Sequence, residues 1–86
     1  MPVAQVRRSG SAPVKRASID GVQLSWQSGN DSVPKNLPAG PHVFQWYVEG
    51  PGNYGFRFLQ PGGIACVPSG KLAKGEQNFG ECPFNL

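Results

Sequence analysis

Histidine and cysteine are scarce in this chain, and each shortage removes a class of site. Histidine occurs once, at His42, and cysteine twice, at Cys66 and Cys82. A structural zinc site takes four nitrogen or sulfur ligands, so we expect no metal site. His42 lies between Pro41 and Val43, where a strand is expected to start. A lone histidine in such a place is more often a surface residue than a catalytic base.

The sequence signatures of catalysis are also missing. No GxSxG pattern marks a nucleophilic serine. No GxxxxGK[ST] pattern marks a phosphate-binding loop. The five acidic residues show no spacing that pairs two of them as a general acid and base. We therefore expect a protein that is not an enzyme and that needs no cofactor.

Long apolar runs and helical periodicity are absent as well. No run approaches the roughly 20 apolar residues that cross a membrane. The N-terminal segment is basic and lacks the apolar core of a signal peptide. No stretch repeats apolar residues at the helical period, whereas glycine and proline are abundant, with 12 and 9 copies. This composition favours an all-β chain with many turns.

The stretch Val43–Leu59 contains two apolar runs that flank Gly50–Asn53, and it predicts a β-hairpin. Because side chains alternate along a strand, only one register gathers the aromatic rings on one face. The other face is then mixed and carries Tyr47, Gln45 and Arg57. On the apolar face the predicted cross-strand pairs are Val48 with Tyr54, Trp46 with Phe56, and Phe44 with Phe58.

A second turn signal is Asp20-Gly21, which is typical of a two-residue type I′ turn. It predicts a hairpin or a bulged bend in which Ile19 faces Val22 and Lys15 faces Trp26, with further apolar residues on the same face. After a connection over residues 28–41, short strands are expected at Ile64–Val67 and Lys71–Ala73, and residues 74–86 are expected to be irregular. The residues expected to anchor these irregular segments in the core are Val33, Leu37, Phe79 and Phe84.

Five to seven short strands, each with one apolar face, have to bury that face against another layer. The predicted fold is a small two-sheet antiparallel β-sandwich, with a small β-barrel as the alternative. Residues 14–86 are expected to form this single domain. Residues 1–13 are expected to be a disordered basic tail, because they contain Pro2, Pro13 and a Ser-Gly-Ser run without periodicity.

The net charge of +3 is modest, and half of the eight basic residues lie in the first sixteen positions. A basic arm of this kind can contact phosphates, although a solvated tail is the simpler explanation. Cys66 and Cys82 are expected to form a disulfide, which implies an oxidising compartment. The alternative is a pair of free thiols in a cytosolic protein.

Candidate ligand-binding residues lie on the mixed face and in the central loop. A tyrosine ring with amide and guanidinium neighbours can stack a sugar or a base, which singles out Tyr47 with Gln45 and Arg57. Asn53 is added because loops on a rigid scaffold often carry recognition. The alternative is that this face is covered by another strand or is only solvated.

The stretch 37–48, Leu-Pro-Ala-Gly-Pro-His-Val-Phe-Gln-Trp-Tyr-Val, resembles strand starts in small secreted bacterial β-sandwich domains. In those domains a Leu-x-x-Gly turn precedes an alternating strand, and a glycine-rich hairpin follows. The resemblance implies an immunoglobulin-like accessory module of an exported protein. Such a module is secreted or belongs to the cell envelope, and its signal segment is absent from this chain.

Two functions follow as hypotheses. The first is a non-catalytic exported module that binds a protein or a glycan or serves as a structural spacer. The second is a small β-barrel that binds single-stranded nucleic acid through Tyr47, Arg57 and the basic N-terminal arm.

Overall fold

The computed structural model describes residues 2–27 and 29–86, and these residues form eight strands. Met1, at the start of the predicted tail, and Ser28, at the start of the predicted connection, lie outside the described residues. The described part of the chain contains no helix that could span a membrane. The strands are β1 (Val3–Ser9), β2 (Val14–Ile19), β3 (Val22–Gln23), β4 (Lys35–Asn36), β5 (Pro41–Glu49), β6 (Gly52–Gln60), β7 (Ser69–Leu72) and β8 (Gln77–Asn85).

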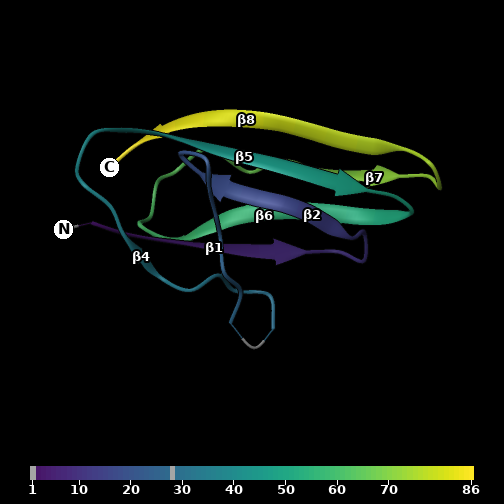
Figure 1. Cartoon of the computed structure of the whole chain (residues 1–86), viewed down its shortest axis with the longest axis horizontal. Helices are drawn as coiled ribbons and strands as arrows, with labels where there is room; N and C mark the ends of the chain where they lie inside the picture. The colour runs from purple at the N-terminus through teal and green to yellow at the C-terminus, as the bar shows by residue number, and fades with distance from the viewer. Residues whose placement is uncertain (1, 28) are drawn as a thin grey trace.

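The strands form two four-stranded sheets, in the orders β4-β1-β6-β7 and β3-β2-β5-β8 (Figure 1). Every pairing within the sheets is antiparallel. The predicted two-sheet β-sandwich is therefore confirmed, and the alternative of a barrel is not.

Most consecutive strands cross between the two layers, whereas β2–β3 and β6–β7 each pair within one sheet. In each of the pairs β1–β2, β3–β4, β5–β6 and β7–β8, one strand belongs to each sheet. We call such a pair an arch. The sandwich is a stack of four arches in the order β3β4, β1β2, β5β6 and β7β8. The predicted hairpin over Val43–Leu59 is consequently wrong, because β5 pairs with β2 and β8, whereas β6 pairs with β1 and β7.

The rings of β5 and β6 nevertheless meet on the side that alternation predicts. The ring centroid of Phe44 lies 5.4 Å from that of Phe56 and 5.7 Å from that of Phe58, both at steep interplanar angles. These contacts cross from one sheet to the other. The alternation of apolar and polar residues indicates which side of a strand is apolar. It does not distinguish two strands paired within one sheet from two strands that face each other across two sheets.

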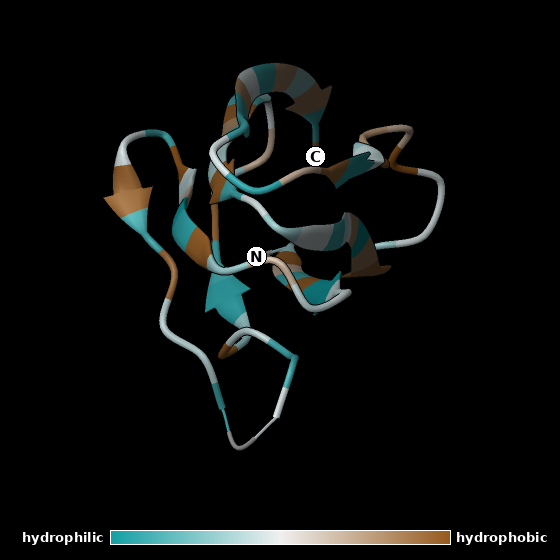
Figure 2. Cartoon of the chain, turned by 90° about the vertical axis from the view of Figure 1, so that its right-hand side faces the viewer, coloured by the Kyte–Doolittle hydropathy of each residue, from teal (hydrophilic) through white to brown (hydrophobic). Residues whose placement is uncertain are grey.

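The core between the sheets is built from this alternation. Figure 2 shows hydrophobic and hydrophilic residues following one another along the strands. The buried hydrophobic residues are Ala4, Val6, Ala12, Ala17, Ile19, Leu24, Leu37, Phe44, Val48, Tyr54, Phe56, Cys66 and Phe84.

Three arch turns stack at one end of the sandwich, the right-hand end in Figure 1. The backbone N–H of Ala12 donates to the carbonyl of Asn53 at 3.0 Å, and that of Gly50 donates to Glu76 at 2.8 Å. The approach is close: a Cβ atom at Gly10 would lie 2.1 Å from the Asn53 carbonyl oxygen, and one at Gly50 would lie 2.1 Å from a backbone oxygen of the next turn. Glycine is required here because these backbones touch.

The predicted disordered tail over residues 1–13 is wrong in its described part, because β1 is a central strand. It pairs with β6 on one side and β4 on the other, and Val6 is 0% exposed. The tail prediction failed because β1 reads Val-Ala-Gln-Val-Arg-Arg-Ser, where two charges follow a short apolar run. Its apolar residues reach the core only because distant strands flank it.

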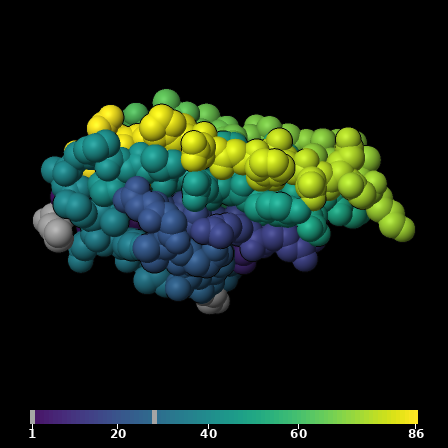
Figure 3. Space-filling view, turned by 45° about the horizontal axis from the view of Figure 1, so that its top comes forward, coloured from purple at the N-terminus to yellow at the C-terminus, as the bar shows by residue number. Residues whose placement is uncertain are grey.

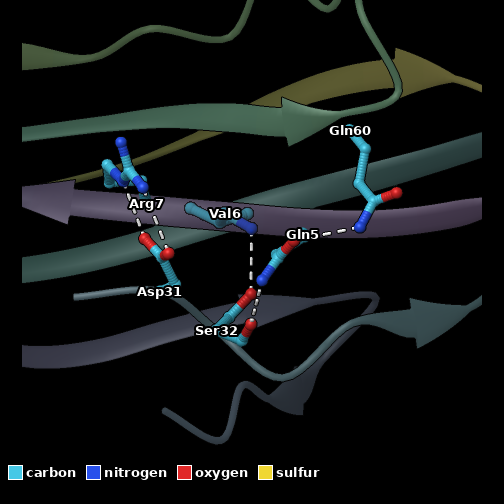
Figure 4. Close-up of polar contacts among 6 residues, drawn as sticks. All are labelled: Gln5, Val6, Arg7, Asp31, Ser32 and Gln60. Carbon is cyan, nitrogen blue, oxygen red and sulfur yellow. Dashed lines mark hydrogen bonds and ion pairs between the residues drawn. The ribbon is translucent and has the colours of Figure 1, made fainter. Parts of the chain in front are cut away.

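Polar contacts fasten the loop before β4 onto β1 (Figure 4). Buried Ser32 accepts a hydrogen bond from the Val6 N–H through its Oγ at 2.9 Å, and its own N–H donates to the Val6 carbonyl at 2.8 Å. Arg7 donates from Nε to Asp31 Oδ1 at 2.7 Å and from Nη2 to Oδ2 at 3.2 Å. Gln5 Nε2 donates to the Ser32 carbonyl at 3.0 Å, and Gln5 is itself held by Gln60, whose Nε2 donates to Gln5 Oε1 at 2.9 Å. These contacts order a segment that reads as loop.

The Asp20-Gly21 turn is confirmed. Both residues have positive φ, 54° and 80°, as a type I′ turn requires, and Ile19 faces Val22. The predicted apolar face is only partly right, because Val22 is exposed. Trp26 does not face Lys15; it bridges to Ser32, and the guanidinium of Arg8 lies 4.2 Å from its ring centroid.

The C-terminal third differs most from expectation. The strand predicted at Ile64–Val67 is absent, and the one predicted at Lys71–Ala73 appears as β7. The predicted irregular tail contains the nine-residue β8. Its side chains alternate weakly, and its partner β5 lies far away in sequence. Of the predicted anchors, Leu37 and Phe84 are buried, whereas Val33 and Phe79 are exposed.

The predicted disulfide is confirmed. It joins Cys66 to Cys82 over a Cα–Cα distance of 5.9 Å and a sequence separation of 16. Cys66 lies in the segment between β6 and β7, which has no strand pairing of its own, and Cys82 lies on β8. The bridge therefore ties that segment to the opposite sheet.

Replacing Val6 by Asp should abolish cooperative unfolding or destabilise the fold by several kcal/mol, because it would bury an unpaired charge. The matched control is Val67→Asp at an exposed valine, which should change stability by about 0.5 kcal/mol or less. Thermal unfolding followed by circular dichroism measures both. Equal melting temperatures for the two variants would show that residues before β2 are not part of the core.

Reducing the Cys66–Cys82 disulfide should lower the free energy of unfolding by about 3 kcal/mol, because the freed loop gains chain entropy when unfolded. Urea unfolding with and without reductant measures this difference. The double variant Cys66→Ser/Cys82→Ser serves as control and should not respond to reductant. A wild-type protein that also fails to respond would mean that no such bridge forms in solution.

Candidate functional site

The candidate site is the outer face of the β2–β5–β8 sheet, where a row of side chains crosses three strands. Arg16 on β2 lies opposite Tyr47 on β5, and Tyr47 lies opposite Phe79 on β8. In the next row Gln45 lies opposite Glu81. We call these five residues the platform. They point outward because Phe44, Trp46 and Val48, which alternate with them on β5, point into the core.

The two rings of the platform are nearly parallel. Their centroids are 6.0 Å apart and their planes are inclined by 14°. Phe79 is 68% exposed, the highest value among the exposed large hydrophobic residues of the described chain. The hydroxyl of Tyr47 donates to Gln77 Oε1 at 2.5 Å, which holds its ring in place. A large apolar ring displayed beside a fixed one, with polar groups around both, is typical of a recognition surface.

The polar rim is arranged beside the rings. Gln45 Nε2 donates to Glu81 Oε2 at 3.1 Å, and Ser18 Oγ lies 3.4 Å from Gln45 Oε1. None of the ion pairs within the described residues involves Arg16. The platform residues, together with Trp46 and Gly80, line a shallow, open depression of about 530 Å³. A guanidinium, an amide and a carboxylate therefore offer both donors and acceptors next to an apolar surface.

Two of the four predicted site residues belong to this platform and two do not. Gln45 and Tyr47 lie on it as expected. Arg57 lies on the outer face of the other sheet, opposite Arg7 on β1, because its neighbours Phe56 and Phe58 point inward. Asn53 is exposed at the start of β6 in the stacked turns, where its carbonyl is bonded to Ala12.

The nucleic-acid site predicted from Tyr47, Arg57 and the N-terminal arm is not assembled. Tyr47 and Arg57 lie on opposite outer faces, and the arm forms strand β1 and the beginning of β2. Of its arginines, Arg7 is paired with Asp31 and Arg8 lies over the Trp26 ring, whereas Arg16 on β2 lies beside Tyr47.

Phe79, Glu81 and Arg16 were not predicted as site residues. The alternation of side chains along β8 could have indicated two of them. If Cys82 and Phe84 point inward, Glu81 and Phe79, which lie an odd number of residues away from Cys82, point outward. Arg16 has no such signal, because its position beside Tyr47 depends on the long-range pairing of β2 with β5.

His42 is buried and fully engaged by two acceptors. Its Nδ1 lies 2.5 Å from Asp20 Oδ2, and its Nε2 lies 2.7 Å from the Pro38 carbonyl oxygen. Asp20 also accepts a hydrogen bond from the Val43 N–H at 2.9 Å. A carboxylate and a carbonyl only accept, so both contacts are hydrogen bonds when the ring is a doubly protonated imidazolium. In that state neither nitrogen has a lone pair for base catalysis.

The same contacts shift both pKa values. The hydrogen bond to Asp20, supported by that to Pro38, raises the pKa of His42 above its ordinary 6.5. The hydrogen bond from His42, supported by that from Val43, lowers the pKa of Asp20 below its ordinary 3.8. The pair therefore fixes the β2–β3 turn to the beginning of β5. Histidine was predicted to lie on the surface here, and that prediction is wrong.

Comparison of the chain with protein families, with curated proteins and with solved structures finds no match. The resemblance to immunoglobulin-like accessory modules therefore stays a prediction, as does the expectation that the protein is not an enzyme. Within residues 2–27 and 29–86, no group of three or more His, Cys, Asp or Glu side chains is placed to hold a metal ion.

The His42–Asp20 pair predicts a pH dependence of stability. The contribution of His42 is complete below pH 6.5 and is lost as pH rises through its raised folded pKa; that of Asp20 is complete above pH 3.8 and is lost as pH falls through its lowered folded pKa. The pair should therefore stabilise most between these two values. Urea unfolding at a series of pH values measures the profile.

The control for this profile is Asp20→Asn, which keeps a residue that tolerates positive φ and removes the charge. Above pH 6.5 its stability should fall less steeply than that of the wild type. Parallel profiles for the two proteins would contradict a charged His42–Asp20 pair.

Proposed function

We propose that this protein is a non-catalytic glycan-binding module of an exported protein and that the platform holds the sugar. The observation that carries the proposal is the exposed Phe79 ring set parallel to Tyr47 and rimmed by hydrogen-bonding groups. Sugars present apolar C–H faces and a circumference of hydroxyls. Such a ligand matches a ring surface with donors and acceptors beside it.

The polar residues of the platform provide the hydrogen bonds that a sugar would need. Gln45 and Glu81 already bond to each other, so each is oriented and still has unused hydrogen-bonding capacity. Arg16 adds a planar donor that suits a hydroxyl pair or the carboxylate of an acidic sugar. The depression of about 530 Å³ is within the range of small-ligand sites, and its openness suits a chain passing across it.

Export is supported by the disulfide. A bridge between Cys66 and Cys82 is compatible with an oxidising, extracellular location, where such bonds persist. A small domain with a compact core also gains stability from such a bridge, which suits a module exposed to the surroundings of a cell.

Native gel electrophoresis in gels containing hydroxyethyl cellulose, xylan or polygalacturonate tests the proposal. We expect at least one polysaccharide to retard the protein. Phe79→Ala and Tyr47→Ala should each weaken that binding about tenfold, equivalent to about 1.4 kcal/mol, because each removes a stacking ring. The matched control Val67→Ala truncates an exposed residue outside the platform and should bind as the wild type does.

Retardation that is equal in the wild type and in both ring variants would place binding elsewhere. A wild type that migrates unchanged in every gel would argue against a glycan among these three classes. Stronger retardation by polygalacturonate than by the other two polysaccharides, lost in the Arg16→Gln variant, would identify the ligand as an acidic sugar.

A further inference from the structure

The long open edge of the sandwich is β8. Within the described chain, β8 pairs only with β5, along all nine of its residues and without a bulge. Gly40 and Leu86 exchange both backbone hydrogen bonds, at 2.9 and 3.0 Å. Counting back from Leu86, every second residue therefore bonds to β5. The residues between them direct their backbone groups to the open side: Gln77, Phe79, Glu81, Pro83 and Asn85.

This edge is less protected than the other sheet edges against pairing with an additional strand. The remaining edge strands are short, with two residues in β3 and β4 and four in β7. Short strands, charges, prolines and bulges are the usual means by which sheet edges avoid pairing. On β8 only Pro83 and Glu81 serve this purpose, and all five outward residues are exposed. Figure 3 shows β8 in yellow, running uncovered across the surface.

We propose that the β8 edge pairs antiparallel with β8 of a second copy of this chain, about a twofold axis at Phe79. In this register Phe79 faces Phe79 of the other copy, and Gln77 faces Glu81. Each of the facing residues has a backbone N–H and a carbonyl directed to the open side, so each pair exchanges two hydrogen bonds. Pro83, which has no N–H, lies beyond the paired stretch.

Side-chain complementarity favours a second copy as the occupant. Gln77 accepts from Tyr47 through Oε1, which leaves its NH₂ group to donate across the edge. Glu81 accepts from Gln45 through Oε2, which leaves Oε1 to accept that bond. A twofold axis at Glu81 would instead oppose two like charges. The Phe79 rings of the two copies would meet side by side and continue the stacked row.

The size of this contact sets its strength. It uses one strand edge per chain, so it belongs with small, weak interfaces of about 1,200 Å² or less. The dissociation constant of the dimer should be micromolar or higher, so the fraction of dimer should rise with protein concentration.

Sedimentation velocity over a concentration series tests the proposal without any glycan, so its result is independent of the proposed function. The mass of the wild type should rise from 9.2 kDa toward twice that value and stop there. Phe79→Pro removes the central edge N–H and should remain monomeric at every concentration. The matched control Asn85→Pro removes an outward N–H beyond the paired stretch and should dimerise as the wild type does.

Amide hydrogen exchange of the wild-type protein gives a second test of the dimer that needs no variant. Raising the concentration should slow exchange at the amides of Gln77, Phe79 and Glu81 and leave that of Asn85 unchanged. A wild type that stays at 9.2 kDa, a Phe79→Pro variant that dimerises, growth beyond the dimer, or protection elsewhere would overturn the proposal.

Discussion

The contact of Phe44 with Phe56 and Phe58 across the two layers is the interaction on which this structure depends. Phe44 lies on β5 and its partners lie on β6, and these are inner strands of opposite sheets. Phe84 extends the cluster, with its ring centroid 4.8 Å from that of Phe58. Because the two central strands are held together by side chains and not by backbone hydrogen bonds, each remains free to pair on both of its edges.

The same aromatic cluster determines which residues lie on the outer face of the β2–β5–β8 sheet. Once Phe44 and Trp46 point inward, Gln45 and Tyr47 have to point outward, and the pairing of β5 with β8 then places Glu81 and Phe79 beside them. The candidate site is therefore a consequence of core packing in the neighbouring positions. A change that shifted β5 by one residue would destroy both together.

The sequence predicted those features that local chemistry determines. The Asp20-Gly21 turn, the inward aromatic residues and the cysteine pair all follow from side chains and short spacing. The hairpin over Val43–Leu59 did not form, because a short glycine-proline turn serves an arch as well as a hairpin. Strands β1 and β8 were missed because their apolar residues gain their environment only from strands far away in sequence. Two of the five platform residues, Gln45 and Tyr47, were therefore predicted from the sequence. Phe79 and Glu81 were missed although the alternation along β8 indicates their side, and the position of Arg16 depends on the long-range pairing of β2 with β5.

The stacked turns have a consequence for how this molecule can change. Where backbone touches backbone at Gly10 and Gly50, even a methyl group has no room, so these two turn positions do not admit a larger residue. The segment between β6 and β7 lies away from this packing, fastened through Cys66. Variation, whether selected or engineered, is thus excluded at the touching glycines and finds more room in the segment between β6 and β7.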